Sequence, residues 1–239
     1  MNDITQHSTR SIQSLALLAA LQLADSFFPS GMYTQSHGLE GFVAAGWAGT
    51  ERIGALLRSY LLHSAGPSEA LAARWACRAA QAGDLALVAA IDERLEAGKL
   101  SAEARLASRR CGGRVLLLGR DLYGGELLSG YAARVSAGQA PGHQSIALAL
   151  LGAAAGLDEE TAALVELHSF AVSLLGAAVR LGALDHAQAQ RLLLGAQPTL
   201  AEAAAIGRAL DWREIGGFAP QIEIMQFRHC YADMHMFVS

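Results

Sequence analysis

Apolar side chains recur every three or four residues along much of this chain, and this spacing constrains the fold more than any other feature. Ala and Leu, both good helix formers, dominate the sequence, and no run of alternating β-branched residues predicts a strand. The clearest stripe lies within residues 161–181 and collects Leu164, Leu167, His168, Ala171, Leu174, Leu175, Ala178 and Leu181. Such spacing places the apolar side chains on one face of a helix. We therefore expect an all-α protein.

Turn-forming residues divide the expected helices. Asp84 and Ser101 are placed to cap helix N-termini, where a side-chain oxygen accepts from backbone N–H groups. Gly66-Pro67, with Ser68 as the following cap, and Pro198 predict breaks. This punctuation predicts a single compact domain, a helical bundle of about ten helices joined by short turns. We expect a disordered segment over 1–12, a helical domain over 13–230 and a C-terminal tail over 231–239.

Charge and hydropathy exclude several classes of protein. The net charge is −4, from 18 basic and 22 acidic residues, which is unlike a nucleic-acid-binding protein. The strongest apolar runs, 15–21 and 146–157, are shorter than the roughly 20 residues that span a bilayer. Three widely spaced cysteines do not form a disulfide framework. We expect a cytoplasmic protein that binds neither nucleic acid nor membrane.

Motifs for catalysis and for metal binding are missing from the sequence. It contains no Gly-x-Ser-x-Gly, no phosphate-binding loop, no His-Glu-x-x-His and no Cys-x-x-Cys. The nearest ligand-like group is His229, Cys230, Asp233 and His235, which we interpret as a polar C-terminal tail. His168 lies on an apolar stripe and is expected to be a core histidine. The sequence thus predicts no catalytic residue, no metal ligand and no cofactor.

Residues 29–41, PSGMYTQSHGLEG, differ from the Ala- and Leu-rich sequence around them. Pro29 is expected to end the preceding helix, because the residue before proline avoids the α region. Ser30-Gly31 then turns the chain, and Ser36 is placed to cap a second helix. Glu40 lies four residues after Ser36, one too many for a capping box, so its carboxylate is available to another partner.

Three stretches of this sequence resemble the UreF family of urease accessory proteins. Leu21 through Glu40 match the pattern L-Q-L-x-D-S-x-x-P-x-G-x-[FY]-x-x-S-x-G-L-E almost throughout. PGHQSIALALLGAAAGL (141–157) is similar to the start of a middle helix in the family. LHSFAVSLLGAAVRLGALDHAQAQRLL (167–193) is similar to a long helix pair. The resemblance covers nearly the whole chain in the same order.

The resemblance implies a scaffold with no enzymatic activity of its own. It implies an all-α homodimer that binds UreD (UreH in some organisms), recruits the nickel-carrying GTPase UreG and assists nickel delivery to apo-urease. Carried over position by position, it implies a surface for the GTPase or for the dimer contact. That surface comprises Pro29, Gly31, Tyr33, Ser36, Gly38, Glu40 and Arg180. His37 falls at a variable place in the family pattern.

The C-terminal sequence departs from the family pattern. Family members end with Arg-His-Glu, a tyrosine and then Leu-Phe-Arg-Ser. Arg228 and His229 remain here, but Cys230 replaces the glutamate, Asp233 the tyrosine and Val238 the arginine. In the family this tail is thought to become ordered on binding UreD, which implies a UreD contact through Arg228, His229 and Phe237. The divergent tail leaves an alternative open, a generic helical interaction module with a different partner.

Overall fold

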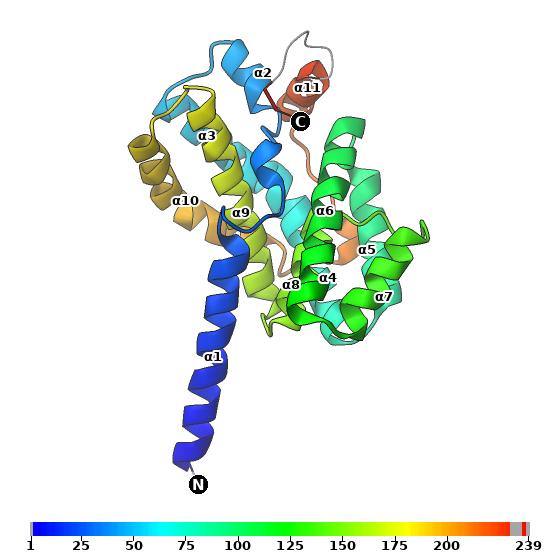
Figure 1. Ribbon diagram of the computed structural model, residues 1–239. Helices are drawn as coiled ribbons and strands as arrows, with labels where there is room; N and C mark the ends of the chain where they lie inside the picture. Colours follow the sequence, from blue (N-terminus) through cyan, green and yellow to red (C-terminus); the bar gives the residue numbers. More distant parts are fainter. Residues whose placement is uncertain (1, 230–235, 238–239) are drawn as a thin grey trace.

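The computed structural model describes residues 2–229 and 236–237, and of residues 2–12, 228 and 229 it describes the backbone alone. Helices follow one another along this part of the chain, and no strand occurs in it (Figure 1). The α-helices are α1 (Asn2–Ala24), α2 (Leu39–Ala44), α3 (Thr50–Tyr60), α4 (Leu71–Gln81), α5 (Leu85–Gly98), α6 (Ala102–Tyr123), α7 (Gly125–Ser136), α8 (Gln144–Ala154), α9 (Glu159–Arg180), α10 (His186–Ile206) and α11 (Pro220–His229). Two 3₁₀ turns, η1 (Met32–Thr34) and η3 (Trp212–Glu214), and a π-helical segment, η2 (Leu61–Ala70), complete them. The expected all-α fold with a single compact domain is confirmed.

Side-chain caps fix several helix starts. The Asp84 carboxylate accepts from Leu87 N at 2.9 Å, and Ser101 Oγ accepts from Ala104 N at 3.3 Å. Asp158 caps α9 in the same way. Each of these oxygens satisfies a backbone N–H group that has no partner inside its helix. The predicted caps at Asp84 and Ser101 are therefore confirmed.

Two clusters of buried side chains form the core. In the first, α4 and α6 pack on α8, which is buried along almost its whole length, and α5 packs on α4. In the second, α2, α3, η2 and α10 pack around α9, and α11 packs on α2. Near the start of α9, Ala162 and Val165 belong to the first cluster and Ala163 to the second, and the buried apolar residues from Leu167 onward belong to the second. Helix α9 therefore joins the two halves of the molecule.

The predicted break at Gly66-Pro67 is wrong. The chain continues from α3 through η2 into α4, and Pro67 lies inside the π-helical segment. Pro67 has no N–H group to donate to an earlier carbonyl of this helical segment, and the segment at 215–218 supplies donors from outside it. Gly216 N donates to Pro67 O at 3.0 Å, and Phe218 N donates to His63 O at 2.9 Å. Ser68 accordingly lies within the segment and does not cap a new helix.

The predicted break at Pro198 is also wrong, because this proline lies inside α10. A proline in a helix frees the carbonyl of the residue four positions earlier, here Leu194. Leu194 and Pro198 are both exposed, so water can bind that carbonyl and the helix continues.

Helix α1 begins at Asn2 and extends away from the other helices (Figure 1). The division of the chain into 1–12, 13–230 and 231–239 stays a prediction. Helix α9 is long and apolar enough to cross a membrane, yet 67% of its most apolar window is buried inside the molecule. It is the central helix of a core.

Candidate functional site

The loop between α1 and α2 is held against two helices that are distant in the sequence. Gly31 has a φ of +86° and begins η1, so a residue with a side chain would be strained there. Ser173 Oγ of α9 donates to Met32 O at 3.0 Å, and the buried Gln35 side chain donates to Cys111 Sγ of α6 at 2.9 Å. These two hydrogen bonds fix the loop on α9 and α6.

The turn into α2 corrects the expected role of Ser36. The N-cap of α2 is Gly38, with a φ of +81° and no side-chain capping bond. His37 is also left-handed, with a φ of +55°, so the helix starts later than the sequence suggests. A Cβ on Gly38 would lie 2.9 Å from Gln226 Cγ of α11. Ser36 is fully buried, and its carbonyl accepts from Leu39 N at 2.9 Å.

His37 is fixed from three sides inside this turn. Its Nε2 lies 3.2 Å from Ser173 Oγ, its ring centroid lies 4.6 Å from that of Phe170, and Tyr60 Oη donates to its carbonyl oxygen. Burial lowers the pKa of His37 to about 4. A neutral imidazole packed in this way supports the turn.

An arginine sandwiched between two aromatic rings lies beside the loop. The Arg180 guanidinium carbon is 3.7 Å from the Tyr33 ring centroid and 4.7 Å from the Phe237 ring centroid. Tyr33 is 70% exposed, whereas Phe237 is buried. All three guanidinium nitrogens of Arg180 are buried and donate to no hydrogen-bond acceptor among the described residues. Cation–π attraction to the two rings is what holds this charge in place.

The C-terminal residues that the structure describes contact the same loop region. Met236 N donates to Glu40 Oε1 at 2.8 Å, and Phe237 covers Arg180. The structure thus brings Tyr33, Arg180 and Phe237 together, with Glu40 tied to the residue before Phe237. Gly31, Ser36 and Gly38 shape the turn, and Pro29 is exposed just before it.

Some predicted residues cannot be placed. The side chains of Arg228 and His229 lie outside the described part of the structure, as do Cys230, Asp233 and His235. Among the described residues, no three histidine, cysteine, aspartate or glutamate side chains form a group that could hold a metal ion.

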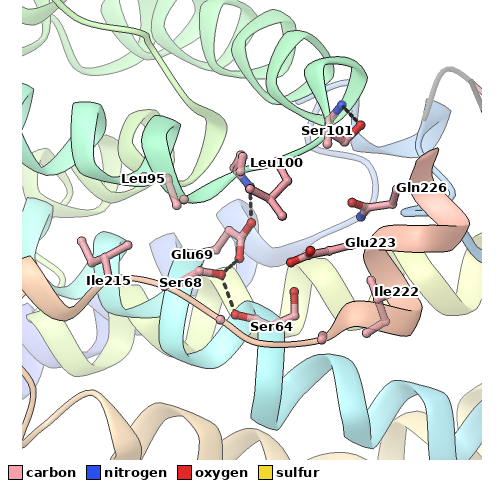
Figure 2. Close-up of a pocket in the computed structure, with 16 residues that line it drawn as sticks. Ser64, Ser68, Glu69, Leu95, Leu100, Ser101, Ile215, Ile222, Glu223 and Gln226 are labelled. Carbon is pink, nitrogen blue, oxygen red and sulfur yellow. Dashed lines mark hydrogen bonds and ion pairs between the residues drawn. The ribbon is translucent and has the colours of Figure 1, made fainter.

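A second candidate site is a small cavity of about 70 Å³ between η2, the loop before α6 and α11 (Figure 2). The Lys99 ammonium binds the Glu69 carboxylate in its wall, and Ser68 Oγ lies within hydrogen-bonding distance of both Glu69 and Ser64 O. Burial opposes ionisation of Glu69, but the charge and hydrogen bond of Lys99 prevail and lower its pKa. Glu69 is therefore a paired carboxylate, and its lowered pKa makes it a weak base toward Ser68.

Two further buried acids lie in the core. Burial raises the pKa of Glu166 to about 8, and one of its carboxylate oxygens has no partner among the described residues. Asp92 accepts hydrogen bonds from Tyr131 Oη and, at 2.6 Å, from Gly142 N, which fixes the start of α8. Burial raises the pKa of Asp92 to about 6. Asp92 is a structural cap supplied by another helix.

Sequence reasoning missed the residues that support the loop. Ser173 lies in the apolar sequence of α9, and Cys111 and Gln35 are 76 positions apart. No local pattern pairs such residues. The only available signal was their polarity within apolar stretches.

A comparison with known protein families shows to which family the chain belongs. The sequence model of the UreF family matches residues 48–197, more than half of the 239 residues. The chain belongs to the UreF family. A urease accessory protein UreF from Lachnoclostridium phytofermentans is 33% identical over 224 residues, which is 93% of this chain and 98% of the relative. One from Trichodesmium erythraeum is 31% identical over 213 residues, covering 89% of this chain and 92% of the relative.

The loop at 29–41 lies before the part that the UreF family model matches. The relatives extend the similarity to it, because a urease accessory protein UreF 2 from Brucella canis is 28% identical over 99% of this chain and 97% of its own length. The resemblance read from the sequence is thereby confirmed at the level of the family.

Proposed function

We propose that this protein is a scaffold for the maturation of urease and has no catalytic activity of its own. It binds UreD/UreH, recruits the GTPase UreG and assists nickel delivery to apo-urease, acting as a homodimer in the cytoplasm. Membership of the UreF family supports the maturation role, because the relatives are named urease accessory proteins.

The observation that carries this proposal is that the Arg180 guanidinium lacks hydrogen-bond acceptors among the described residues. The guanidinium can donate five hydrogen bonds, yet its nitrogens are buried. Leaving a buried charged group without hydrogen bonds is costly. A carboxylate from another protein would supply the missing acceptors in the bidentate geometry that arginine favours.

The neighbouring Tyr33 supports the same surface. A large aromatic ring that is 70% exposed beside an arginine combines two residue types that dominate binding energy at protein interfaces. The hydrogen bonds from Ser173 to Met32 O and from Gln35 to Cys111 hold the loop on α9 and α6, so little conformational entropy is lost on binding. We assign Pro29, Tyr33, Glu40 and Arg180 to the face that recruits the GTPase.

The described polar clusters support a non-catalytic role. The Glu69 carboxylate is bound by Lys99, Asp92 caps α8, and His37 is packed between Ser173 and Phe170. Each of these groups already has a structural partner in the same chain.

We further propose that the C-terminal residues couple the UreD/UreH contact to the GTPase face. Phe237 covers Arg180, and Met236 N binds Glu40, so a partner that moves these residues also changes the environment of the arginine. Arg228 and His229 belong to the same proposed UreD/UreH contact.

Copurification tests the proposed function. The tagged chain is coexpressed with UreD/UreH, UreG and apo-urease of the same organism, and we expect it to retain UreD/UreH and, through that complex, UreG. Nickel-dependent urease activity should require the chain. Capture of none of these proteins, together with full urease activity without the chain, would refute the proposal in favour of a helical module with a different partner.

A further inference from the structure

The solvent-facing side of α6 carries a stripe that the fold of the described residues does not use. Leu106, Arg110, Gly113 and Leu117 are spaced i, i+4, i+7 and i+11, so they lie on one face of the helix. All four are exposed, and the two leucine side chains are 48% and 63% exposed. The buried side of α6, which includes Gly112 and Gly119, packs on α8 and the residues just before it. We call these four residues the α6 stripe.

Two adjacent glycines of α6 show what each side of the helix requires. A Cβ on Gly112 would lie 2.0 Å from Gly142 O, so this glycine is needed for the contact with the segment before α8. A Cβ on Gly113 would meet no described atom within 4 Å. An exposed glycine in the middle of a helix is unfavourable compared with alanine. Nothing in the described fold requires Gly113.

The arginines of α6 also fall into two groups. Arg105 and Arg109 both face Glu96, at 3.6 Å for Arg105 Nε and in a closer ion pair for Arg109. Arg110 and Arg114 make no ion pair with any described residue, although they lie four positions apart on the exposed surface. Like charges at this spacing repel each other. An acidic group on the outside would relieve that repulsion.

The α6 stripe continues into the loop of the functional site. Arg114 flanks the stripe, and its Cδ lies 3.6 Å from the position of a Cβ on Gly31. Gly31 begins the 3₁₀ turn that carries the exposed Tyr33. The stripe and the loop therefore border each other on the surface.

We propose that the α6 stripe binds an acidic helix of a partner protein. The leucines supply apolar contact at the two ends, and Gly113 between them lets a second helix approach closely. Arg110 and Arg114 then pair with carboxylates of that helix, which restricts the partner to acidic segments. Because the stripe borders the loop, the inference rests on the proposed function and assigns this helix to UreG, the partner proposed for that loop.

The test compares paired variants of the full chain in the copurification assay and in titration against the captured component. Gly113→Ala fills the gap on the stripe, and Arg110→Glu combined with Arg114→Glu reverses its charge. The matched controls are Gly195→Ala and Arg191→Glu on α10. Gly195 is likewise an open helix glycine, and Arg191 is an exposed arginine.

We expect Gly113→Ala to raise the melting temperature by about 2–4 °C, because alanine favours the helix. The same change should weaken partner binding about tenfold or more. The double charge reversal should weaken binding at least as much, and both controls should bind like the unchanged chain. A lower melting temperature for Gly113→Ala would show that the chain's own fold needs the glycine, which would overturn the inference.

The remaining outcomes separate the inference from the proposed function. If the unchanged chain captures UreD/UreH or UreG and the α6 variants bind equally well, only the α6 inference fails. If the unchanged chain captures neither, the proposed function fails and the inference with it. A change in the light-scattering mass of the variants alone would assign the stripe to a second copy, and loss of binding to vesicles of anionic lipid would assign it to a membrane. Either result would overturn the proposal that the α6 stripe binds an acidic helix.

Discussion

Replacement of Arg180 by methionine separates a binding role from a structural one. Methionine retains an unbranched apolar side chain between the two rings and removes the charge. Cation–π contacts to Tyr33 and Phe237, at 3.7 and 4.7 Å, stabilise the guanidinium by about 0.5–2 kcal/mol each. Burial of its nitrogens without acceptors costs about 3 kcal/mol or more, because the group is charged. Because these terms nearly cancel, Arg180→Met should change the free energy of unfolding by less than about 1 kcal/mol.

Partner binding should respond much more strongly than stability. An arginine that receives its acceptors only from the partner is expected to contribute about 2 kcal/mol or more, which corresponds to roughly a 30-fold change in Kd. Tyr33→Ala should weaken GTPase recruitment in the same direction, with unchanged helical circular dichroism. Arg191→Met, an exposed arginine of α10, is the matched control and should leave binding unaltered.

Urea unfolding monitored by circular dichroism gives the stability, and titration of the UreD/UreH-bound chain with UreG gives the affinity. The reasoning fails if Arg180→Met lowers the free energy of unfolding by more than about 2 kcal/mol while the Kd stays the same. Arg180 would then be a structural residue of the loop.

Three further changes test the fold around the site. Gly112→Ala should destabilise the protein by about 3 kcal/mol, because the added Cβ would lie 2.0 Å from Gly142 O; calorimetry showing an unchanged melting temperature would contradict the contact. Gly38→Ala should cost about 1–3 kcal/mol through its φ of +81° and its overlap with Gln226, and a chemical denaturation midpoint equal to that of the unchanged chain would exclude this strain. Burial raises the pKa of Glu166 from 4.5 to about 8, so the folded state keeps a proton that the unfolded state releases. The contribution of Glu166 to the free energy of unfolding is therefore fully present below pH 4.5 and is lost as the pH rises from 4.5 to about 8. Glu166→Gln should remove a slope of about 1.4 kcal/mol per pH unit in that window, and unfolding curves with the same slope for both proteins would show that Glu166 does not titrate there.

The features of the fold that depend on residues close together in the sequence could be predicted. Asp84 and Ser101 cap helices as expected, because a cap joins a side chain to a backbone group only three residues away. The breaks at Pro67 and Pro198 could not be predicted. The helix continues through Pro67 because Gly216 N and Phe218 N, distant in the sequence, bind carbonyls of that segment. It continues through Pro198 because that part of α10 is exposed to water.

The resemblance could name members of the candidate site but not their geometry, and their binding role stays a proposal. The resemblance to the family pointed to Tyr33, Arg180 and Phe237 individually. Their stacking depends on the way α9 passes under η1, through the hydrogen bond from Ser173 to Met32. The prediction that Ser36 caps α2 was wrong because His37 and Gly38 both adopt left-handed backbone angles, which delays the helix start to Leu39. The local sequence is equally compatible with a serine cap, so it could not reveal this turn.

The extended segment at 215–218 is not a free hinge. It lies outside any helix or strand, yet its amide protons at Gly216 and Phe218 are bound by carbonyls of the π-helical segment, and Ile215 is fully buried. These amides should exchange with deuterium as slowly as those of neighbouring helices. The start of α11 is therefore held by the two hydrogen bonds between this segment and η2, and Met236 and Phe237, which follow α11 in the sequence, contact Glu40 and Arg180.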